Sequence, residues 1–200
     1  SHLVLRSFVV GYYNERVYIH QTERENNRMI TNFDYLKAES KFSRFADVAI
    51  SAEKLILMDP EASIINCRRA MEFAIKWMYS VDSELEMPYQ DNLQSLMNAE
   101  EYREIVGQDL WKRMDYIRRC GNNVAHSNKK LGLDEAMLCL ENLFIYLDFV
   151  ACCYSDRYEE HSFDKTIITT RIEKAKKSRE AAETTKADLV KEQEKSAQKE

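Results

Sequence analysis

The chain has 200 residues and a formal net charge of −5. Its length and its 44% of apolar side chains are enough for one globular domain with a hydrophobic core and an appendage. The four glycines stand apart at positions 11, 107, 121 and 132, which excludes a Gly-rich phosphate loop, a Walker A motif and a dinucleotide-binding fingerprint. Because there are also only 2 prolines, the composition favours helices over sheets and long loops.

The cysteines give no sign of a metal centre or of a disulfide framework. They form no Cys-x-x-Cys pair and no cluster with histidine, and most lie within apolar helical patterns, as reduced and packed thiols do. No stretch reads as a signal peptide or as a membrane-length apolar run. We therefore expect a cytoplasmic protein without a metal site or a membrane partner. The cysteines are Cys67, Cys120, Cys139, Cys152 and Cys153.

Residues 1–28 differ in composition from the rest of the chain. Residues 8–13 and 17–20 are aromatic and β-branched, and the polar residues between them suit a short β-hairpin. An isolated hairpin is marginal in water, so this one would have to pack on the helices or on a second chain. Met29 would also make a natural start, which leaves open whether this extension is native.

From Asn32 onward the apolar pattern is helical, and residues 29–160 are predicted to form one bundle. An apolar stripe over residues 42–56 stops at Asp59-Pro60, and a second helix is expected over residues 61–79. Asp91 is suited to cap a short helix that includes Leu93, Leu96 and Met97. Further helices are expected over residues 101–106 and 109–120.

The last apolar segment follows a polar loop at residues 127–130. It begins at Leu133 or Asp134, is hydrophobic nearly all round through Tyr154, and is therefore expected to be the central helix. Residues 161–200 become rich in Lys, Glu, Ala and Thr from Arg171 onward. This tail reads as an exposed helix or a disordered linker, leading toward downstream domains that this chain lacks.

The segment from Ile117 to His126 looks most like a functional site. If a helix runs through Gly121, then Arg118, Asn122 and His126 are spaced i, i+4, i+8 and share one face. Arg118 and His126 would then lie roughly 12 Å apart at Cα, so that cation, amide and imidazole could converge on one phosphate or carboxylate. An imidazole can move a proton near neutral pH, and an arginine can stabilise charge on a phosphoryl group.

The same segment also has a purely structural interpretation. Gly121 and Asn122 would end the helix with a left-handed backbone, and His126 would bond to a neighbouring backbone group. The two arginines of the segment Cys67–Glu72 also have two interpretations each. Arg69 could join the basic pocket, whereas Arg68 could instead form an i,i+4 ion pair with Glu72.

Two exposed lysines, Lys129 and Lys130, follow His126 and would suit a nucleic-acid backbone. The remaining histidines, His2, His20 and His161, are scattered and form no ligand set.

These residues are part of a longer pattern. Its members are Phe33, Phe45-Ala46, Ala52-Glu53-Lys54, Asp59-Pro60-Glu61-Ala62, Cys67-Arg68-Arg69-Ala70-Met71-Glu72, Ile117-Arg118-Arg119-Cys120-Gly121-Asn122 and Ala125-His126. Over residues 30–155 the chain resembles the HEPN-like helical domain found at the N-terminus of many type I restriction endonuclease R (motor) subunits. The resemblance implies an all-α, HEPN-like bundle that commonly dimerises. It implies no cofactor for this segment, with ATP and Mg serving the full-length R subunit.

Active HEPN ribonucleases cleave RNA without a metal, using an Arg, a polar residue and a His in an Arg-x4–6-His motif. Asn122 and His126 match the polar and histidine positions of that motif. The arginine expected directly before Asn122 is instead Gly121, and Arg118 and Arg119 lie earlier in the chain.

The first functional hypothesis is therefore a regulatory module that binds nucleic acid, RNA or DNA, or assembles with the other restriction–modification subunits. Arg69, Arg118, Arg119, Lys129 and Lys130 would contact the nucleic acid. The second hypothesis is a metal-independent ribonuclease, with His126 as general base or acid, Arg118 or Arg119 on the phosphate and Asn122 orienting the scissile group. The third is a purely structural oligomerisation domain.

Overall fold

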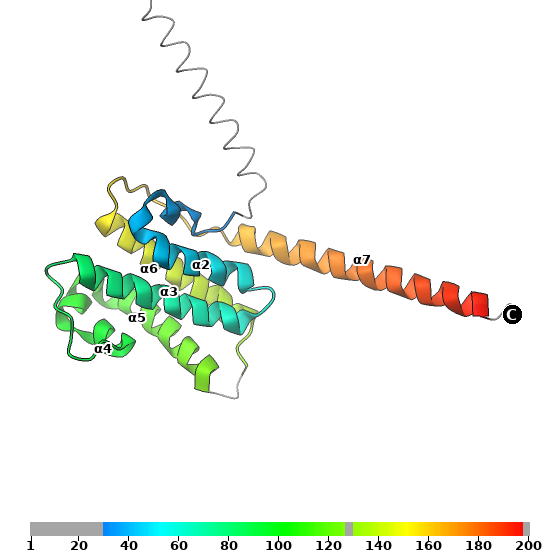
Figure 1. The fold of residues 1–200 in the computed structure, drawn as a ribbon, viewed down its shortest axis with the longest axis horizontal. Helices are drawn as coiled ribbons and strands as arrows, with labels where there is room; N and C mark the ends of the chain where they lie inside the picture. The colour runs from blue at the N-terminus through cyan, green and yellow to red at the C-terminus, as the bar shows by residue number, and fades with distance from the viewer. Residues whose placement is uncertain (1–29, 127–129, 198–200) are drawn as a thin grey trace, which may run out of the picture. The chain divides into compact units, whose positions relative to one another are not determined.

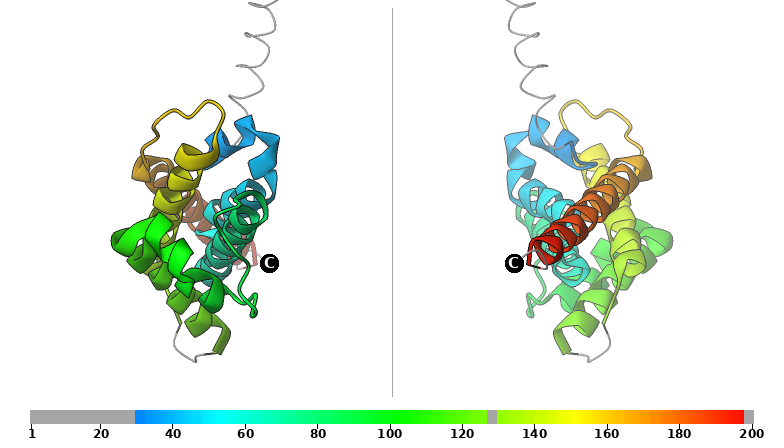
Figure 2. Two further views of the ribbon diagram at one scale, coloured as in Figure 1. Left: turned by 90° about the vertical axis from the view of Figure 1, so that its left-hand side faces the viewer. Right: turned by 90° about the vertical axis from the view of Figure 1, so that its right-hand side faces the viewer.

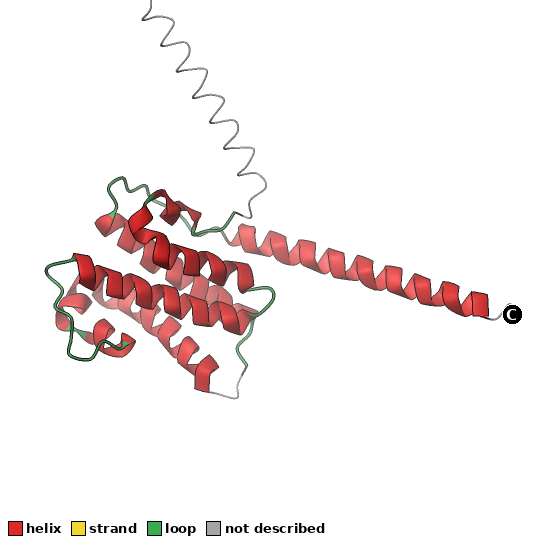
Figure 3. Cartoon of the chain, viewed as in Figure 1, coloured by secondary structure: helices red, strands yellow, loops and turns green. Residues whose placement is uncertain are grey.

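The computed structural model describes residues 30–126 and 130–197, and the chain divides into two units, residues 1–31 and 32–200. All the helices of the described residues lie in the second unit. Every regular element in its described part is a helix (Figure 3), which confirms the all-α prediction. The hairpin predicted within residues 1–28 lies outside the described residues.

The order of the elements follows the predicted order closely. Two short 3-10 helices precede six α-helices in the described residues. The elements are η1 (Asp34–Ala38), η2 (Ser40–Phe42), α2 (Ser43–Leu55), α3 (Pro60–Val81), α4 (Leu93–Asn98), α5 (Glu100–His126), α6 (Leu133–Tyr154) and α7 (Lys165–Ala197).

Helix α3 organises the bundle, because it packs against α2, α4, α5 and α6 (Figures 1 and 2). The contact with α2 includes a buried hydrogen bond, in which Ser63 Oγ donates to the Ala52 carbonyl at 2.8 Å. Small residues such as Ala70 and Ala74 are fully buried on α3 and let the neighbouring helices approach closely. The course of α3 therefore decides which of its side chains meet α5.

Helix α6 is the apolar core helix that the sequence predicted. It packs against α2, α3 and α5, and the side chains of Leu140, Leu143 and Leu147 are fully buried. By length and hydropathy alone α6 could cross a membrane, contrary to our reading that no such run is present, but 56% of its most apolar window is buried inside the bundle. Within the core, the hydroxyls of Tyr102 and Tyr146 lie 3.0 Å apart and satisfy each other.

Local sequence signals explain where the helices begin and bend. Asp59 accepts a hydrogen bond from the Ala62 backbone N–H at 2.9 Å, with proline at the first helical position of α3. The cap of α4 is Asn92, not the predicted Asp91, since the Asn92 side chain accepts from the Ser95 N–H. A kink at Gly107, with φ 70° and ψ 166°, separates the two helices predicted within α5.

Helix α7 begins in contact with the bundle and continues as an exposed helix. Ile168 is fully buried, whereas the side chains of residues 173–184 are exposed. The charged tail is therefore a helix over residues 165–197, the first of the two predicted alternatives.

Candidate functional site

The motif segment lies on the C-terminal part of α5, which continues without a break through Gly121 to His126. Among the described residues, only Gly107 has a positive φ, so Gly121 does not adopt a left-handed capping conformation. The helix-cap interpretation of Gly121 and Asn122 is therefore wrong. The premise that Arg118, Asn122 and His126 share one helix face holds.

The two arginines of the motif share one carboxylate on the preceding turn. Arg118 binds Asp115 Oδ1 through Nε at 2.9 Å and Nη2 at 2.8 Å, and Arg119 Nε lies 3.0 Å from Asp115 Oδ2. Side chains on a helix lean toward its N-terminus, which directs both guanidinium groups away from His126. The predicted convergence of Arg118, Asn122 and His126 on one anion is thus not present in this arrangement.

The remaining motif residues are open to solvent to different degrees. His126 is exposed in the last turn of α5, Asn122 is half-buried one turn earlier, and Lys130 is exposed after the loop. Lys129 lies outside the described residues. Within the described residues, neither Asn122 nor His126 has a hydrogen-bonding partner, so both polar groups are available to a ligand.

Arg69 does not reach the motif as a helper. Its guanidinium lies along its own helix, 3.5 Å from Asn66 Oδ1 and 6.0 Å from the centre of the Phe73 ring. The preceding residue, Arg68, is the arginine of α3 that meets α5, and its side chain crosses that helix at Gly121. The sequence does not single out Arg68, because the spacing of two adjacent arginines does not say which one faces a neighbouring helix.

The alternative ion pair between Arg68 and Glu72 is also absent from the described residues. Glu72 instead pairs with Lys76, with 3.0 Å between Oε1 and Nζ. Arg68 Nε is buried and has no hydrogen-bond partner among the described residues.

The motif segment includes one thiol, Cys120, which is hydrogen-bonded to the Cys139 thiol on α6. Cys67 and Cys139 are buried, as predicted, and Cys120 is buried as well. Cys152 and Cys153 are exposed, so the prediction of packed thiols is wrong for these two, and all five cysteines are free. A hydrogen bond with the Cys139 thiol lowers the pKa of Cys120 to about 7, and the Tyr116 hydroxyl and the Arg119 charge act in the same direction.

Cys67 behaves differently, because burial raises the pKa of its thiol. It therefore stays protonated and packs as a small apolar side chain.

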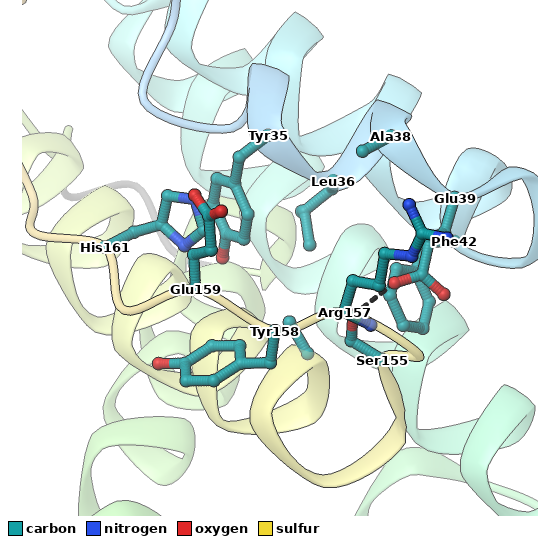
Figure 4. A pocket seen from close by; sticks show the side chains of 11 residues that line it. Tyr35, Leu36, Ala38, Glu39, Phe42, Ser155, Arg157, Tyr158, Glu159 and His161 are labelled. Carbon is teal, nitrogen blue, oxygen red and sulfur yellow. Dashed lines mark hydrogen bonds between the residues drawn. The ribbon is translucent and has the colours of Figure 1, made fainter.

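A second polar cluster, which the sequence did not indicate, borders a cavity of about 270 Å³ (Figure 4). His161 stacks on Tyr35 with 4.0 Å between ring centroids, and His161 Nδ1 lies 3.4 Å from Asp148 Oδ1. The Tyr158 hydroxyl donates to Asp148 Oδ2 at 2.8 Å. Through these contacts with Tyr35 and Asp148, His161 is part of a cluster and is not isolated.

The cavity lies between the 3-10 segment and the residues that follow α6. Its lining residues are Tyr35, Leu36, Ala38, Glu39, Phe42, Ala151, Ser155, Arg157, Tyr158, Glu159 and His161. Glu39 fixes one side of it, since its carboxylate accepts from Ser155 Oγ and pairs with Lys41 Nζ at 2.8 Å. These contacts anchor the segment after α6 to the start of the bundle.

Among the described residues, no group of three or more His, Cys, Asp and Glu side chains is placed to hold a metal ion. The candidate site consists of Arg68 on α3 and of Arg118, Arg119, Asn122 and His126 on α5. No protein-family model, curated protein or solved structure was found to match this chain.

Proposed function

We propose that residues 30–155 are a HEPN-like module that binds nucleic acid, or assembles with partner subunits, at the N-terminus of a type I restriction endonuclease R subunit. The whole protein would translocate DNA with ATP and cut it. The single observation that best supports this proposal is the unbroken course of α5 after the kink at Gly107, which keeps Arg118, Asn122 and His126 on one face.

The charges around this face are consistent with phosphate binding. The side chain of Arg119 is 62% exposed although it pairs with Asp115, and Lys130 is exposed after the loop. The chain as a whole carries a net charge of −5, so nucleic acid would be held by a local patch and not by the overall field. Such binding should weaken steeply as salt is raised.

The partners in this proposal are nucleic acid, the other restriction–modification subunits and a second copy of this chain in the cytoplasm. HEPN sites are generally built at a two-fold interface, where two copies of the motif face each other. Light scattering at micromolar concentration is therefore expected to give a dimer. A monomer would count against a shared site.

Binding is tested by titrating the full chain into fluorescently labelled single-stranded RNA, single-stranded DNA and duplex DNA of equal length, with EDTA present. We expect an anisotropy increase for at least one of the three, and a lower affinity at about 200 mM than at about 50 mM salt. Absence of binding to all three at about 50 mM salt would overturn the nucleic-acid part of the proposal.

A metal-independent ribonuclease is the second candidate, and the exposed His126 one turn after Asn122 is the observation that favours it. In that case His126 would move the proton of the RNA 2′-hydroxyl. Incubation of labelled RNA in EDTA should then yield cyclic-phosphate ends with the wild-type chain and none with His126→Ala. Cleavage that persists in this variant would exclude the assigned role.

A further inference from the structure

The side chain of Arg68 lies across the bare backbone of α5 at Gly121. A Cβ atom added at Gly121 would lie 2.4 Å from Arg68 Cδ, 3.1 Å from its Cβ and 3.3 Å from its Cγ. Real Cβ atoms do not approach other carbons to 2.4 Å, so any side chain at position 121 would push Arg68 away. Glycine at position 121 therefore gives the Arg68 side chain its path across α5.

Arg68 carries a positive charge at the crossing of α3 and α5, and no carboxylate of the described residues pairs with it. Asp115 holds Arg118 and Arg119, and Lys76 takes the carboxylate of Glu72. Buried donors are nearly always hydrogen-bonded in folded proteins, and an unpaired one costs free energy. The Nε–H group of Arg68 is such a donor. The residue as a whole is only half-buried, so an acceptor from outside the bundle would meet the terminal N–H groups of its guanidinium.

The neighbourhood of Gly121 supplies a second free polar group. Asn122, the next residue, is half-buried and has no hydrogen-bonding partner among the described residues. A guanidinium offers several N–H donors in a planar fork that matches the oxygens of a phosphate, and an amide can add one more donor. Arg69, by contrast, is directed to Asn66 on its own helix.

We propose that Arg68 forms a phosphate-binding site at the crossing of α3 and α5. Gly121 leaves room for the Arg68 side chain, and Asn122 adds an amide donor. The chemical class of its ligand is a phosphate mono- or diester. That this phosphate belongs to nucleic acid rests on the proposed function, but the site itself does not. The arginine that the motif lacks at position 121 would thus be supplied from α3.

The first test asks whether the site binds phosphate at all. In the full chain labelled with 15N, the Arg68 Nε–Hε resonance is followed while inorganic phosphate is added. We expect a saturable shift of this resonance, and no saturable shift of the Arg69 resonance. An Arg68 resonance that does not move, or moves no more than that of Arg69, would overturn the proposal.

The second test uses matched variants and labelled RNA or DNA, whichever binds. Arg68→Ala should weaken binding about tenfold, while Arg69→Ala, which removes the same charge one residue away, should change it less than twofold. Gly121→Ala keeps every charge but displaces Arg68, so it should weaken binding as much as Arg68→Ala. Equal binding by Arg68→Ala and wild type would contradict the proposed site.

Loss of folding is separated from loss of the site by the double variant. Gly121→Ala should lower the melting temperature because of its collision with Arg68. Adding Arg68→Ala removes the Cγ and Cδ contacts but leaves the Cβ contact at 3.1 Å, so it should restore part of the melting temperature but not the binding. A restored affinity in the double variant would overturn the proposal.

If wild type binds no nucleic acid while the Arg68 resonance responds to phosphate, the proposed function fails and the site stands. If nucleic acid binds and Arg68→Ala has no effect, the site fails and the proposed function stands.

Discussion

The carboxylate of Glu53, which is fully buried, accepts two hydrogen bonds from one residue, Asn32. The backbone N–H of Asn32 lies 2.9 Å and its side-chain Nδ2 3.1 Å from the same oxygen, Glu53 Oε2. The other oxygen lies 3.3 Å from Arg171 Nη1 in the first part of α7. Glu53 therefore joins the start of the bundle, α2 and α7.

This arrangement predicts a specific pH dependence of stability. Burial is the main cause that raises the pKa of Glu53, against the hydrogen bonds of Asn32 and the charge of Arg171, which lower it. A raised folded-state pKa contributes stability that is complete below the unfolded value of about 4.3 and is lost as the pH rises through the folded value. The melting temperature of wild type should thus fall relative to that of Glu53→Gln as the pH rises above about 4.3.

Glu53→Gln keeps an acceptor for Asn32 but cannot ionise, so it removes this titration and leaves the others in place. Thermal unfolding of both proteins across this range is the measurement. A difference in melting temperature that stays constant, or that moves in favour of wild type as the pH rises, would show that Glu53 does not have a raised pKa.

The backbone at Gly107 gives a second prediction. Its φ of 70° and ψ of 166° lie in a region that only glycine adopts readily, and an added Cβ would meet no atom within 4 Å. Gly107→Ala should therefore lower the free energy of unfolding by about 1–3 kcal/mol through backbone strain alone. Urea denaturation measures this, and Asp109→Ala, a nearby exposed change, should stay within about 0.5 kcal/mol of wild type.

Asp115 limits the positive charge of the motif, which leads to a third prediction. Asp115→Asn removes the carboxylate that holds Arg118 and Arg119, and under the proposed function it should strengthen nucleic-acid binding several-fold at low salt. The matched control is Asp109→Asn, which makes the same charge change on α5 where the side chain is 98% exposed. Equal gains in both variants would mean that only net charge matters and that the two arginines take no part.

Two tyrosines beside the cavity should respond in opposite ways to loss of their hydroxyls. The Tyr158 hydroxyl donates to Asp148, so Tyr158→Phe should cost about 1 kcal/mol of unfolding free energy. The Tyr35 hydroxyl is buried without a hydrogen-bond partner in the described residues, so Tyr35→Phe should be neutral or stabilising. If Tyr35→Phe proves as costly as Tyr158→Phe, the Tyr35 hydroxyl must have an acceptor.

Much of the fold follows from local signals that can be read in the sequence. Asp59-Pro60 marks the junction of α2 and α3, Gly107 divides α5, and the apolar run from Leu133 gives the core helix α6. These features depend on capping, on backbone freedom and on helical periodicity, which act within a few residues. The cap of α4 was misplaced by one residue because Asp91 and Asn92 are both good capping residues.

The site was only partly predictable, because its contacts depend on how the helices pack. The shared face of Arg118 and His126 follows from helical periodicity once α5 is known to continue through Gly121. That Arg68 rather than Arg69 crosses α5 depends on the rotation of α3, which the packing of the core determines. His161 beside Tyr35 joins residues far apart in the chain, and no local pattern indicates such a contact.

A nucleic-acid site on α5 is tested most directly by comparing Asn122→Ala with Asn123→Ala. The measurement is an anisotropy titration of labelled single-stranded RNA, in EDTA and about 50 mM salt. Both variants remove one amide from the same turn of α5, but Asn122 is half-buried and lies four residues from both Arg118 and His126, whereas Asn123 is exposed and lies five residues from Arg118. We expect Asn122→Ala to weaken binding about fivefold to tenfold and Asn123→Ala to bind as wild type does. Equal affinities for all three proteins would contradict a nucleic-acid site on this face of α5.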